Sequence, residues 1–318
     1  MRALRFLDKL KLIKDYPKPK SEKDEALIKV LMAGICNTDI EITRGYSRFH
    51  GTLGHEFVGI VEEVNSTNKS LVGKRVVGEI NIGCGDCEFC RQDLARHCKN
   101  IHVLGIVDKD GYMAEYVTLP IENLIVVPDS ISDECATFCE PLAAGMEILE
   151  QVHIKPMDKI CILGDGKLGL LIDFALSGVQ ADITHVGKHK NKLDIIKNYC
   201  SRTMLIDELT NQAFDIVVEA TGSVNSLETS LKIVKPHGTI ILKSTVAASK
   251  EIDLTPVVVN EITIVGSRCG RFQPALNALA TGLDLTLLIS KVYPFEESLS
   301  AFDKACEKGT LKILLDMR

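Results

Sequence analysis

The chain has no tryptophan, and aromatic residues fill only 5% of its 318 positions, which removes the stacking platform that often marks a sugar-binding protein. No apolar run is long enough to cross a bilayer, because Asp, Lys or Gly interrupts each candidate, so we expect no membrane anchor. The net charge of −6 comes without long blocks of one sign. This balance argues against a nucleic-acid partner, which usually requires a basic patch.

The N-terminal segment also lacks the unbroken apolar stretch of a secretory signal peptide. The 11 cysteines are therefore expected to be reduced, in a cytoplasmic protein, and clustered cysteines in such a chain usually bind metal or take part in catalysis. Hydrophobic residues make up 46% and charged residues 25%, as in an ordinary globular protein. The length predicts two domains.

The two halves of the chain differ in their hydrophobic pattern. Within the first 145 residues, runs rich in β-branched residues and punctuated by glycine predict strands at 26–33, 57–64 and 75–80. From residue 159 onward, predicted strands alternate with predicted helices, at 159–164, 167–177, 182–186, 190–200, 203–206, 214–220, 223–234, 238–243 and 262–266. Such alternation predicts a parallel sheet with helices on both faces.

These patterns predict a mostly β domain over 1–145 and a nucleotide-binding α/β domain over 146–270. The segment 271–318 ends in a strand-like run at 311–315. We expect this segment to return to the first domain and complete it.

Four cysteines lie close together, separated by two, two and seven residues: Cys84, Cys87, Cys90 and Cys98. Four thiolates suit the tetrahedral coordination of a structural zinc ion, which would clamp a loop and contribute to folding. An iron–sulfur cluster is the alternative. The ferredoxin pattern has its fourth cysteine after three residues and a proline behind it, whereas here the gap is seven and Lys99 follows. Zinc is therefore favoured.

A glycine-rich loop follows the strand predicted at 159–164 and opens the next helix: Gly164, Asp165, Gly166, Lys167, Leu168 and Gly169. In this strand–loop–helix setting the three glycines predict a dinucleotide site, with the pyrophosphate at the helix N-terminus. An acid within such a loop does not help to bind an anion, so we expect the side chain of Asp165 to point away from the phosphates.

The end of the next strand indicates which dinucleotide binds. An acid there would bind the ribose 2′-hydroxyl of NAD, but this chain has Gly187, Lys188, His189 and Lys190. The glycine leaves room, and the basic side chains offer positive charge for a 2′-phosphate. We therefore predict NADP over NAD; the alternative is that both lysines are simply solvated.

Four further segments place chemically active residues beside glycine or proline: Cys36 to Thr38 after Gly34, His55-Glu56 after Gly54, Glu140 before Pro141, and Thr221 before Gly222. The segment with Cys84, Cys87, Cys90 and Cys98, called the cysteine lobe below, and the glycine-rich loop lie among these segments along the chain. In their order along the chain, all of them together resemble the zinc-dependent medium-chain alcohol dehydrogenases, with the sorbitol and threonine dehydrogenase branch closest. The resemblance implies an α/β protein, with a GroES-like mostly β catalytic domain, a Rossmann doubly wound parallel-sheet domain, and the active site in the cleft between them.

The resemblance also implies roles for these residues. Cys36 and His55 would bind a catalytic zinc, Glu56 would be a further or exchanging ligand with a part in catalysis, and Glu140 would hold the third protein-ligand position, directly or through water. With the lobe, this makes two zinc ions per chain. The Thr38 hydroxyl would take the substrate proton. In some members of the family, a histidine at the position of Glu41 ends the proton relay. Thr221 would border the cofactor.

The resulting hypothesis is a zinc-dependent oxidoreductase, acting on a small-molecule alcohol or carbonyl substrate. It would transfer a hydride between a polyol, secondary or primary alcohol and NAD(P), giving a ketone or aldehyde. The family implies a homo-oligomer, either a dimer or a tetramer. Two alternatives remain: a zinc-free NADPH-dependent reductase of the same superfamily, and a nucleotide-sensing protein without enzymatic activity.

Overall fold

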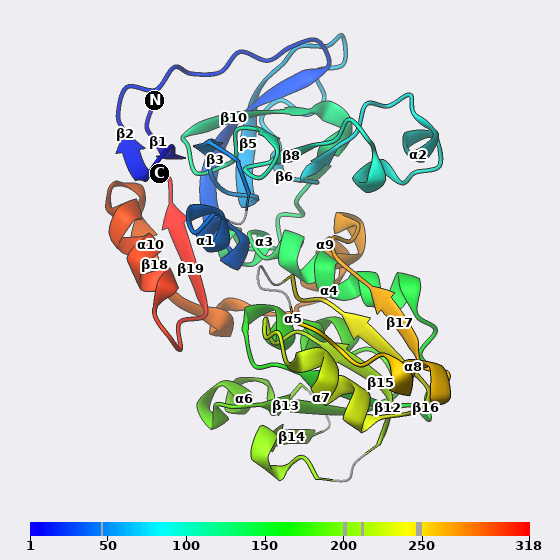
Figure 1. Ribbon diagram of the computed structural model, residues 1–318. Coiled ribbons are helices and arrows are strands. Elements are labelled where there is room, and N and C mark those ends of the chain that lie inside the picture. Colours follow the sequence, from blue (N-terminus) through cyan, green and yellow to red (C-terminus); the bar gives the residue numbers. More distant parts are fainter. Residues whose placement is uncertain (46, 200–201, 211–212, 246–249) are drawn as a thin grey trace. The chain divides into compact units, whose positions relative to one another are not determined.

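The computed structural model describes residues 1–45, 47–199, 202–210, 213–245 and 250–318 (Figure 1). The chain forms two compact units. The first combines Met1–Glu140 with Phe272–Arg318, and the second is Pro141–Arg271. Among the described residues, no helix combines the length and the apolar character needed to cross a bilayer.

The first unit is built around a seven-stranded sheet with the order β11-β6-β5-β3-β19-β18, in which β10 also pairs with β3. Its strands are β3 (Glu25–Ile35), β5 (Glu56–Val64), β6 (Arg75–Gly78), β10 (Tyr116–Pro120), β11 (Leu124–Val126), β18 (Ile289–Pro294) and β19 (Lys312–Asp316). Two three-stranded sheets accompany it, formed by β1 (Ala3–Phe6), β2 (Leu10–Ile13) and β4 (Gly51–Thr52), and by β7 (Asn81–Ile82), β8 (His102–Leu104) and β9 (Asp108–Lys109).

The register of three strands brings distant segments together. Ile313 of β19 lies opposite Ile35 of β3, and Gly34 of β3 lies opposite Glu56 of β5, both in antiparallel pairs. The C-terminal end of β3 therefore meets the beginnings of β5 and β19. β19 is hydrogen-bonded into this sheet, so the segment at 311–315 belongs to the first unit.

Helices of this unit are short, and several escaped the sequence analysis. They are α1 (Asn37–Thr43), α2 (Glu88–Arg91), α3 (Asp133–Ala136), α9 (Phe272–Ala280) and α10 (Ser298–Cys306), while α4 (Cys139–Gln151) crosses into the second unit. Pro141 lies in the first turn of α4, where proline is tolerated because the first amides of a helix have no intrahelical acceptor.

The second unit contains a six-stranded parallel sheet with the order β14-β13-β12-β15-β16-β17. Its strands are β12 (Lys159–Leu163), β13 (Asp182–Gly187), β14 (Arg202–Leu205), β15 (Phe214–Glu219), β16 (Val234–Leu242) and β17 (Thr263–Gly266), and its helices are α5 (Lys167–Leu176), α6 (Lys190–Ile196), α7 (Ser226–Ile233) and α8 (Thr255–Val259). Because the first strand lies at the centre and the order reverses beside it, this is the doubly wound Rossmann arrangement predicted from the alternating pattern.

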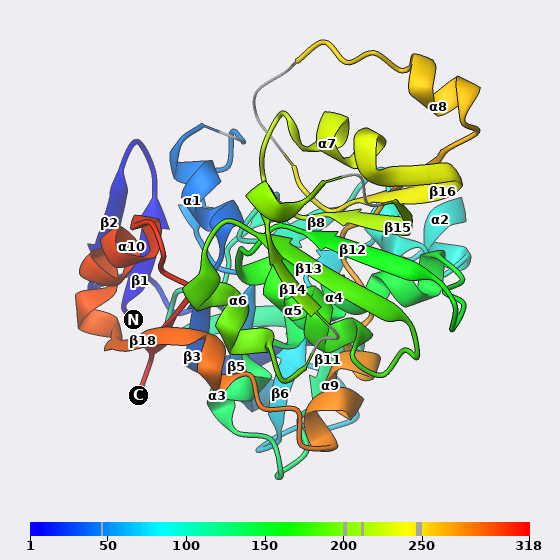
Figure 2. The same cartoon turned by 90° about the horizontal axis from the view of Figure 1, so that it is seen from below.

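Two apolar layers cover this sheet. Ile172 and Leu176 of α5 pack with Ile160 and Ile183 on one face, whereas the other face of the sheet packs against residues of α7 such as Ile233. The two helices lie on opposite sides of the strands (Figure 2). Burial on both faces explains why these strands are apolar throughout rather than alternating.

Candidate functional site

Cys36, His55 and Glu56 converge at one end of the main sheet of the first unit. One ligand atom from each lies within 4.8 Å of the others. Cys36 follows β3, and Glu56 begins β5, so the pairing of these strands produces the convergence. His55 and Glu56 are buried and Cys36 is half-buried.

Asp39, to which the sequence analysis gave no role, connects the two segments. Its carboxylate accepts hydrogen bonds from the backbone N–H groups of Cys36 (2.8 Å) and Gly54 (3.2 Å) and is fully buried. Its Oδ1 also lies 3.2 Å from Nδ1 of His55. A carboxylate behind the imidazole is the usual support of a metal-binding histidine. Here Nδ1 of His55 has no hydrogen-bond partner among the described residues, so Asp39 supports the ring through its charge. Asp39 stands at the third position of α1 after the Cys36 cap, which is a capping-box position.

Lys312, also missed by the sequence analysis, closes the site from β19. Its ammonium group forms an ion pair with Oε2 of Glu56, and the side chains are 2% and 0% exposed. Burial alone lowers the pKa of Lys312, but the charges of Glu56, Cys36 and Glu140 outweigh burial and raise this pKa above its ordinary value. The site is therefore rich enough in negative charge to keep a buried lysine protonated.

The donor set fits a zinc ion. Sulfur, imidazole nitrogen and carboxylate oxygen are its preferred ligands, and mixed sets are typical of catalytic rather than structural zinc. The second oxygen of Glu56, Oε1, is buried and has no hydrogen-bond partner among the described residues. An orphaned carboxylate oxygen is costly unless a cation compensates it. Glu140 is not part of the 4.8 Å group, although its charge acts on Lys312.

The two residues predicted to move the proton lie on α1. The Thr38 hydroxyl is 3.8 Å from the sulfur of Cys36, so it borders the metal-ligand group. Glu41 follows one helical turn later, and its carboxylate accepts a hydrogen bond from Arg44 at 2.9 Å. Residues three apart on a helix lie on the same face, so Glu41 is a neighbour of Thr38, and both side chains are half-buried.

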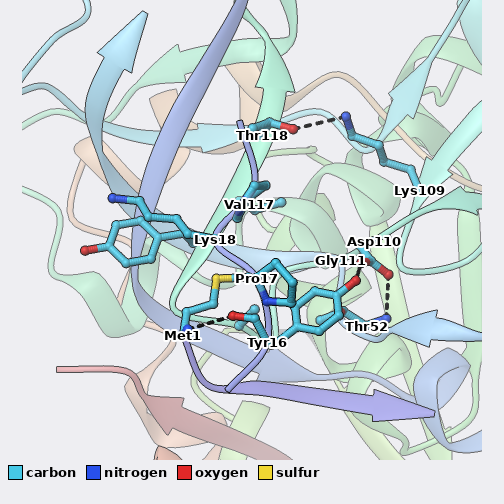
Figure 3. A pocket seen from close by; sticks show the side chains of 13 residues that line it. Met1, Tyr16, Pro17, Lys18, Thr52, Lys109, Asp110, Gly111, Val117 and Thr118 are labelled. Carbon is cyan, nitrogen blue, oxygen red and sulfur yellow. Dashed lines mark hydrogen bonds between the residues drawn. The ribbon is translucent and has the colours of Figure 1, made fainter. Parts of the chain in front are cut away.

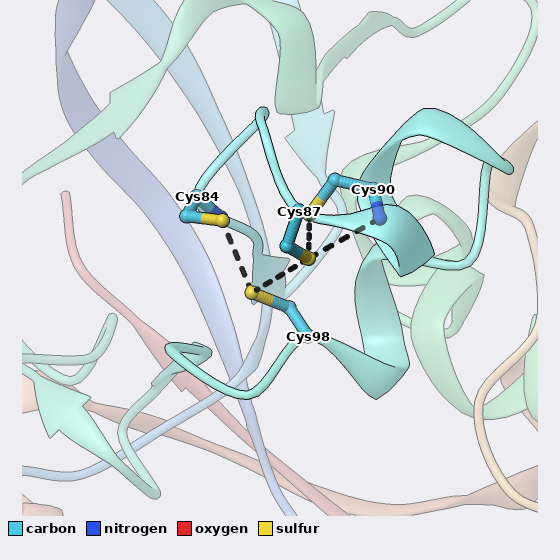
Figure 4. A group of neighbouring side chains, drawn as sticks. All are labelled: Cys84, Cys87, Cys90 and Cys98. Atoms are coloured by element: carbon cyan, nitrogen blue, oxygen red, sulfur yellow. Dashed lines mark hydrogen bonds between the residues drawn. The ribbon is translucent and has the colours of Figure 1, made fainter.

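The four cysteines of the lobe point toward one another from a loop and from the start of α2 (Figure 4). The sulfur of Cys87 is 3.5 Å from that of Cys90 and 3.8 Å from that of Cys98, and all four sulfurs lie within 4.8 Å. Zinc–sulfur bonds of ~2.3 Å in a tetrahedron give sulfur separations of ~3.8 Å. The lobe therefore has the dimensions of a closed zinc site and not of a disulfide.

Backbone amides support the thiolates of this lobe. Cys98 Sγ accepts hydrogen bonds from the N–H groups of Cys84 (3.4 Å) and Asn100 (3.3 Å). The N–H of Cys90 donates to Cys87 Sγ, and this bond is the main cause that lowers the pKa of Cys87 to about 7. The pKa values of Cys84 and Cys90 are raised instead, so of these three thiols only Cys87 is shifted toward the anionic sulfur that zinc requires.

The glycine-rich loop joins β12 to α5 in the second unit. Gly164 has φ +125°, and a Cβ atom there would lie 2.5 Å from the carbonyl oxygen of Ala220 and 2.9 Å from the nitrogen of Thr221. A Cβ atom at Gly169 would lie 1.8 Å from the carbonyl oxygen of Gly164. Only glycine fits at either position. Thr221, after β15, thus lies against the loop at the carboxyl ends of neighbouring strands, where such sheets bind nucleotides.

The side chain of Asp165 points toward the end of β13. Its Oδ2 accepts hydrogen bonds from the backbone N–H groups of Lys188 (2.7 Å) and His189 (2.6 Å) and lies 3.0 Å from Nδ1 of His189. Burial raises the pKa of Asp165, but the bonds from His189 and Lys188 outweigh it and keep this pKa below its ordinary value. An ionised carboxylate therefore occupies the amides of the segment that was predicted to receive a 2′-phosphate.

A separate pocket of about 280 Å³ lies near the N-terminus (Figure 3). Tyr16 donates a hydrogen bond to Asp110 at 2.9 Å, and the same carboxylate accepts one from the N–H of Thr52 at 2.7 Å. No residue predicted to bind metal, cofactor or substrate lines this pocket. We assign no ligand to it.

Comparison with known proteins finds a match for each part of the chain. Residues 22–129 match the family described as the alcohol dehydrogenase GroES-like domain, and residues 137–317 match the glucose dehydrogenase C-terminus. D-arabitol-phosphate dehydrogenase of Enterococcus avium is 31% identical over 95% of this chain and 92% of its own length.

Two solved structures have the same fold. A protein assigned as a zinc-binding dehydrogenase from Sinorhizobium meliloti 1021, bound to NADP, has a TM-score of 0.90 at 25% identity over 99% of this chain and 98% of its own. A short chain alcohol dehydrogenase from E. coli CFT073, complexed with NADH, has a TM-score of 0.92 at 23% identity over 100% and 99%.

Proposed function

The chain belongs to the family of zinc-type alcohol dehydrogenases, and on that basis we propose that its substrate is a polyol or a related secondary alcohol. It is a zinc-dependent oxidoreductase that transfers a hydride between an alcohol and a nicotinamide dinucleotide. The substrate class rests on the Enterococcus relative, whose name specifies D-arabitol phosphate. A secondary alcohol would yield a ketone and a primary alcohol an aldehyde.

Cys36, His55 and Glu56 would hold the catalytic zinc, and Glu140 would be a further ligand, directly or through water. Two observations carry this assignment: the three donor atoms converge within 4.8 Å, and the buried Oε1 of Glu56 has no hydrogen-bond partner in the described part of the chain. When bound, zinc supplies a Lewis acid that polarises the alcohol oxygen and lowers its pKa. The cysteine lobe would hold a second, structural zinc, which makes two per chain.

The proton would leave through α1. Thr38 borders the ligand group and can accept a proton while donating its own, and Glu41 lies on the same helical face. The hydrogen bond from Arg44 holds the Glu41 carboxylate toward the surface, where it can exchange protons with water. Asp39 orients His55, and Lys312 balances the charge of Glu56; neither needs to touch the substrate.

For the cofactor we propose NADP over NAD. Gly187, Lys188, His189 and Lys190 support this choice by space and charge, and the S. meliloti structure was solved with NADP. Asp165 opposes it, because its carboxylate already takes the N–H groups of Lys188 and His189 and would repel a 2′-phosphate. We therefore expect a modest preference rather than an absolute one.

Metal content and turnover together test this proposal. Two zinc ions per chain and oxidation of polyols are expected; a zinc-free reductase would lack the catalytic ion, and a sensing protein would bind dinucleotide without turnover. Cys36→Ser should lose one zinc and most activity, whereas Cys306→Ser, at an exposed thiol of α10, should change neither. A fully active Cys36→Ser enzyme would contradict the assignment. We also expect the chain to form a dimer or a tetramer, and light scattering can measure its oligomeric state.

A further inference from the structure

Two titratable side chains lie buried beside the glycine-rich loop, and the proposed chemistry does not use them. His185 on β13 is 0% exposed, and Asp173 on α5 is 1% exposed. Nδ1 of His185 contacts the carboxylate of Asp173, and Nε2 of the same ring lies 3.0 Å from the carbonyl oxygen of Gly164. One imidazole thus bridges α5 and the first glycine of the loop.

The partners determine where the proton of this ring lies. A carbonyl oxygen can only accept a hydrogen bond, so Nε2 of His185 must carry a proton and donate it to Gly164. Nδ1 either donates to an ionised Asp173 or accepts from a protonated one. Burial raises the pKa of Asp173, and the hydrogen bond and charge of His185 offset this only in part. In both cases the pair has no net charge, which suits its burial, and Nε2 keeps its proton.

Fixing this carbonyl also fixes the neighbouring amide. In a planar trans peptide the C=O of one residue and the N–H of the next point in opposite directions. Because the Gly164 carbonyl points at His185 in the core, the N–H of Asp165 points away from the core. That amide belongs to the loop whose N–H groups are expected to face the pyrophosphate.

Other contacts hold the chain on either side of this peptide. The N–H of Gly164 donates to the carbonyl of Val186 at 2.8 Å, and the Asp165 side chain binds the amides after β13. The missing Cβ atom of Gly169 leaves the space that the Gly164 carbonyl occupies. Rotating this peptide would therefore break the His185 bond first, since the other contacts lie on its two flanks.

We infer that His185, held by Asp173, is a positioning residue that orients the first peptide of the loop for dinucleotide binding. This inference rests on the proposed function, because it assumes that the loop binds a nicotinamide dinucleotide. It concerns binding and not the chemical step. Loss of the His185 bond should weaken the affinity for the cofactor, while turnover at saturating cofactor stays close to normal.

The test measures binding and kinetics separately. Fluorescence titration with NADPH and NADH gives Kd for the zinc-loaded protein, and steady-state assays give KM and kcat. His185→Leu should raise Kd about tenfold, as expected for the loss of one buried hydrogen bond, with kcat changed by less than about twofold. Asp173→Asn should keep Kd near the wild-type value, because an amide N–H can donate to Nδ1 and leave the proton on Nε2.

Ile183→Ala is the matched control. Ile183 lies on the same strand and the same face as His185 and packs in the layer that includes α5. This change should lower the melting temperature, because it leaves a cavity in the core, but should leave Kd unchanged. A purely structural role of His185 would give the two variants the same behaviour.

The outcomes are distinct. A folded His185→Leu protein with unchanged Kd overturns the inference, and a wild-type protein that binds neither NADPH nor NADH overturns the proposed function. If the His185→Leu protein does not fold, nitrogen-15 NMR of the histidines in the wild-type protein tests the inference instead. A proton on Nε2 of His185, with a shift that changes when NADPH binds, supports the inference, and an unprotonated Nε2 overturns it.

Discussion

The ammonium group of Lys312 forms an ion pair with the carboxylate of Glu56, 256 positions earlier in the chain, where both side chains are almost completely buried. A buried ion pair contributes little net stability when intact, but it is costly to break, because one charge is then left without compensation. Among the residues that the structure describes, the other oxygen of Glu56 has no hydrogen-bond partner, and Glu56 lies beside the sulfur of Cys36 and the imidazole of His55. On the proposed assignment, the lysine and the catalytic zinc would share one carboxylate.

Replacing Lys312 by methionine should destabilise the zinc-free protein by about 3–5 kcal/mol, because Glu56 keeps its burial but loses its counterion. Added zinc should recover part of this loss by supplying positive charge at the same carboxylate. Urea unfolding with and without zinc measures both effects. Lys312→Arg is the control and should stay close to wild type, so equal stability of the methionine and arginine variants would contradict the role of the charge.

Replacing Cys98 by serine should remove the zinc of the lobe, because the site needs four thiolates and Cys98 is its buried member. Metal analysis should then find about one zinc per chain instead of two. Limited proteolysis should cut within 84–98, where the clamp on the loop is lost. Retention of both ions would show that the lobe is not a zinc site.

Replacing Thr38 by valine keeps its shape but removes the hydroxyl beside Cys36. We expect kcat to fall by about 10²–10⁴, the usual contribution of a positioned proton-transfer group, with little change in the metal content. Thr38→Ser should preserve most activity, and Glu41→Gln should have a smaller effect than Thr38→Val, because water can replace a surface carboxylate. Normal kcat in Thr38→Val would exclude this proton path.

Replacing Asp165 by asparagine removes the negative charge at the end of β13 but retains an oxygen that can accept from Lys188 and His189. The ratio of kcat/KM for NADP to that for NAD should rise several-fold, because repulsion of the 2′-phosphate disappears. Kinetics with both cofactors, at low and high salt, measure the change. An unchanged ratio would mean that Asp165 does not influence the choice of cofactor.

Low pH should lower the free energy of unfolding of the first unit through Glu25, whose carboxylate accepts a hydrogen bond from the Lys109 ammonium at 2.8 Å. Burial raises the pKa of Glu25, but Lys109 and the N–H of Glu22 outweigh it, so the folded-state pKa is below the ordinary value. The stability that ionised Glu25 contributes is therefore fully present above the unfolded-state pKa of about 4.3 and is lost as the pH falls through the folded-state pKa. Unfolding free energies at pH 6, 4 and 3 should show a smaller acid loss in Glu25→Gln than in wild type.

Local patterns predicted much of the second unit. The strand at 159–164 corresponds to β12, and the helix at 167–177 corresponds to α5, within one residue at each end. The glycine-rich loop between them was recognisable from its three glycines, of which Gly164 and Gly169 meet a local steric demand, whereas Gly166 faces open space. The helix predicted at 190–200 ends at Ile196 in the structure, and Cys200 lies outside the described residues.

The contacts that complete the first site could not be predicted in this way. Lys312 reaches Glu56 only through the register of β19 on β3 and of β3 on β5, and a register of that kind depends on the packing of the whole sheet. Asp39 carried a weaker local signal, since an acid three positions after a helix cap often accepts from the cap amide. The helices α9 and α10 are nine residues each, too short for periodicity alone to separate them from loops.

The pairing of β19 with β3 has a consequence for how the protein is made. A ribosome finishes Cys36, His55 and Glu56 early and then synthesises the entire second unit before it reaches Lys312. Before that strand is made, Glu56 lacks its partner cation and β3 lacks one of its neighbouring strands. The complete set of charges around the catalytic centre therefore exists only once β19 has been added, and a metal ion bound before that moment would meet a different set of charges.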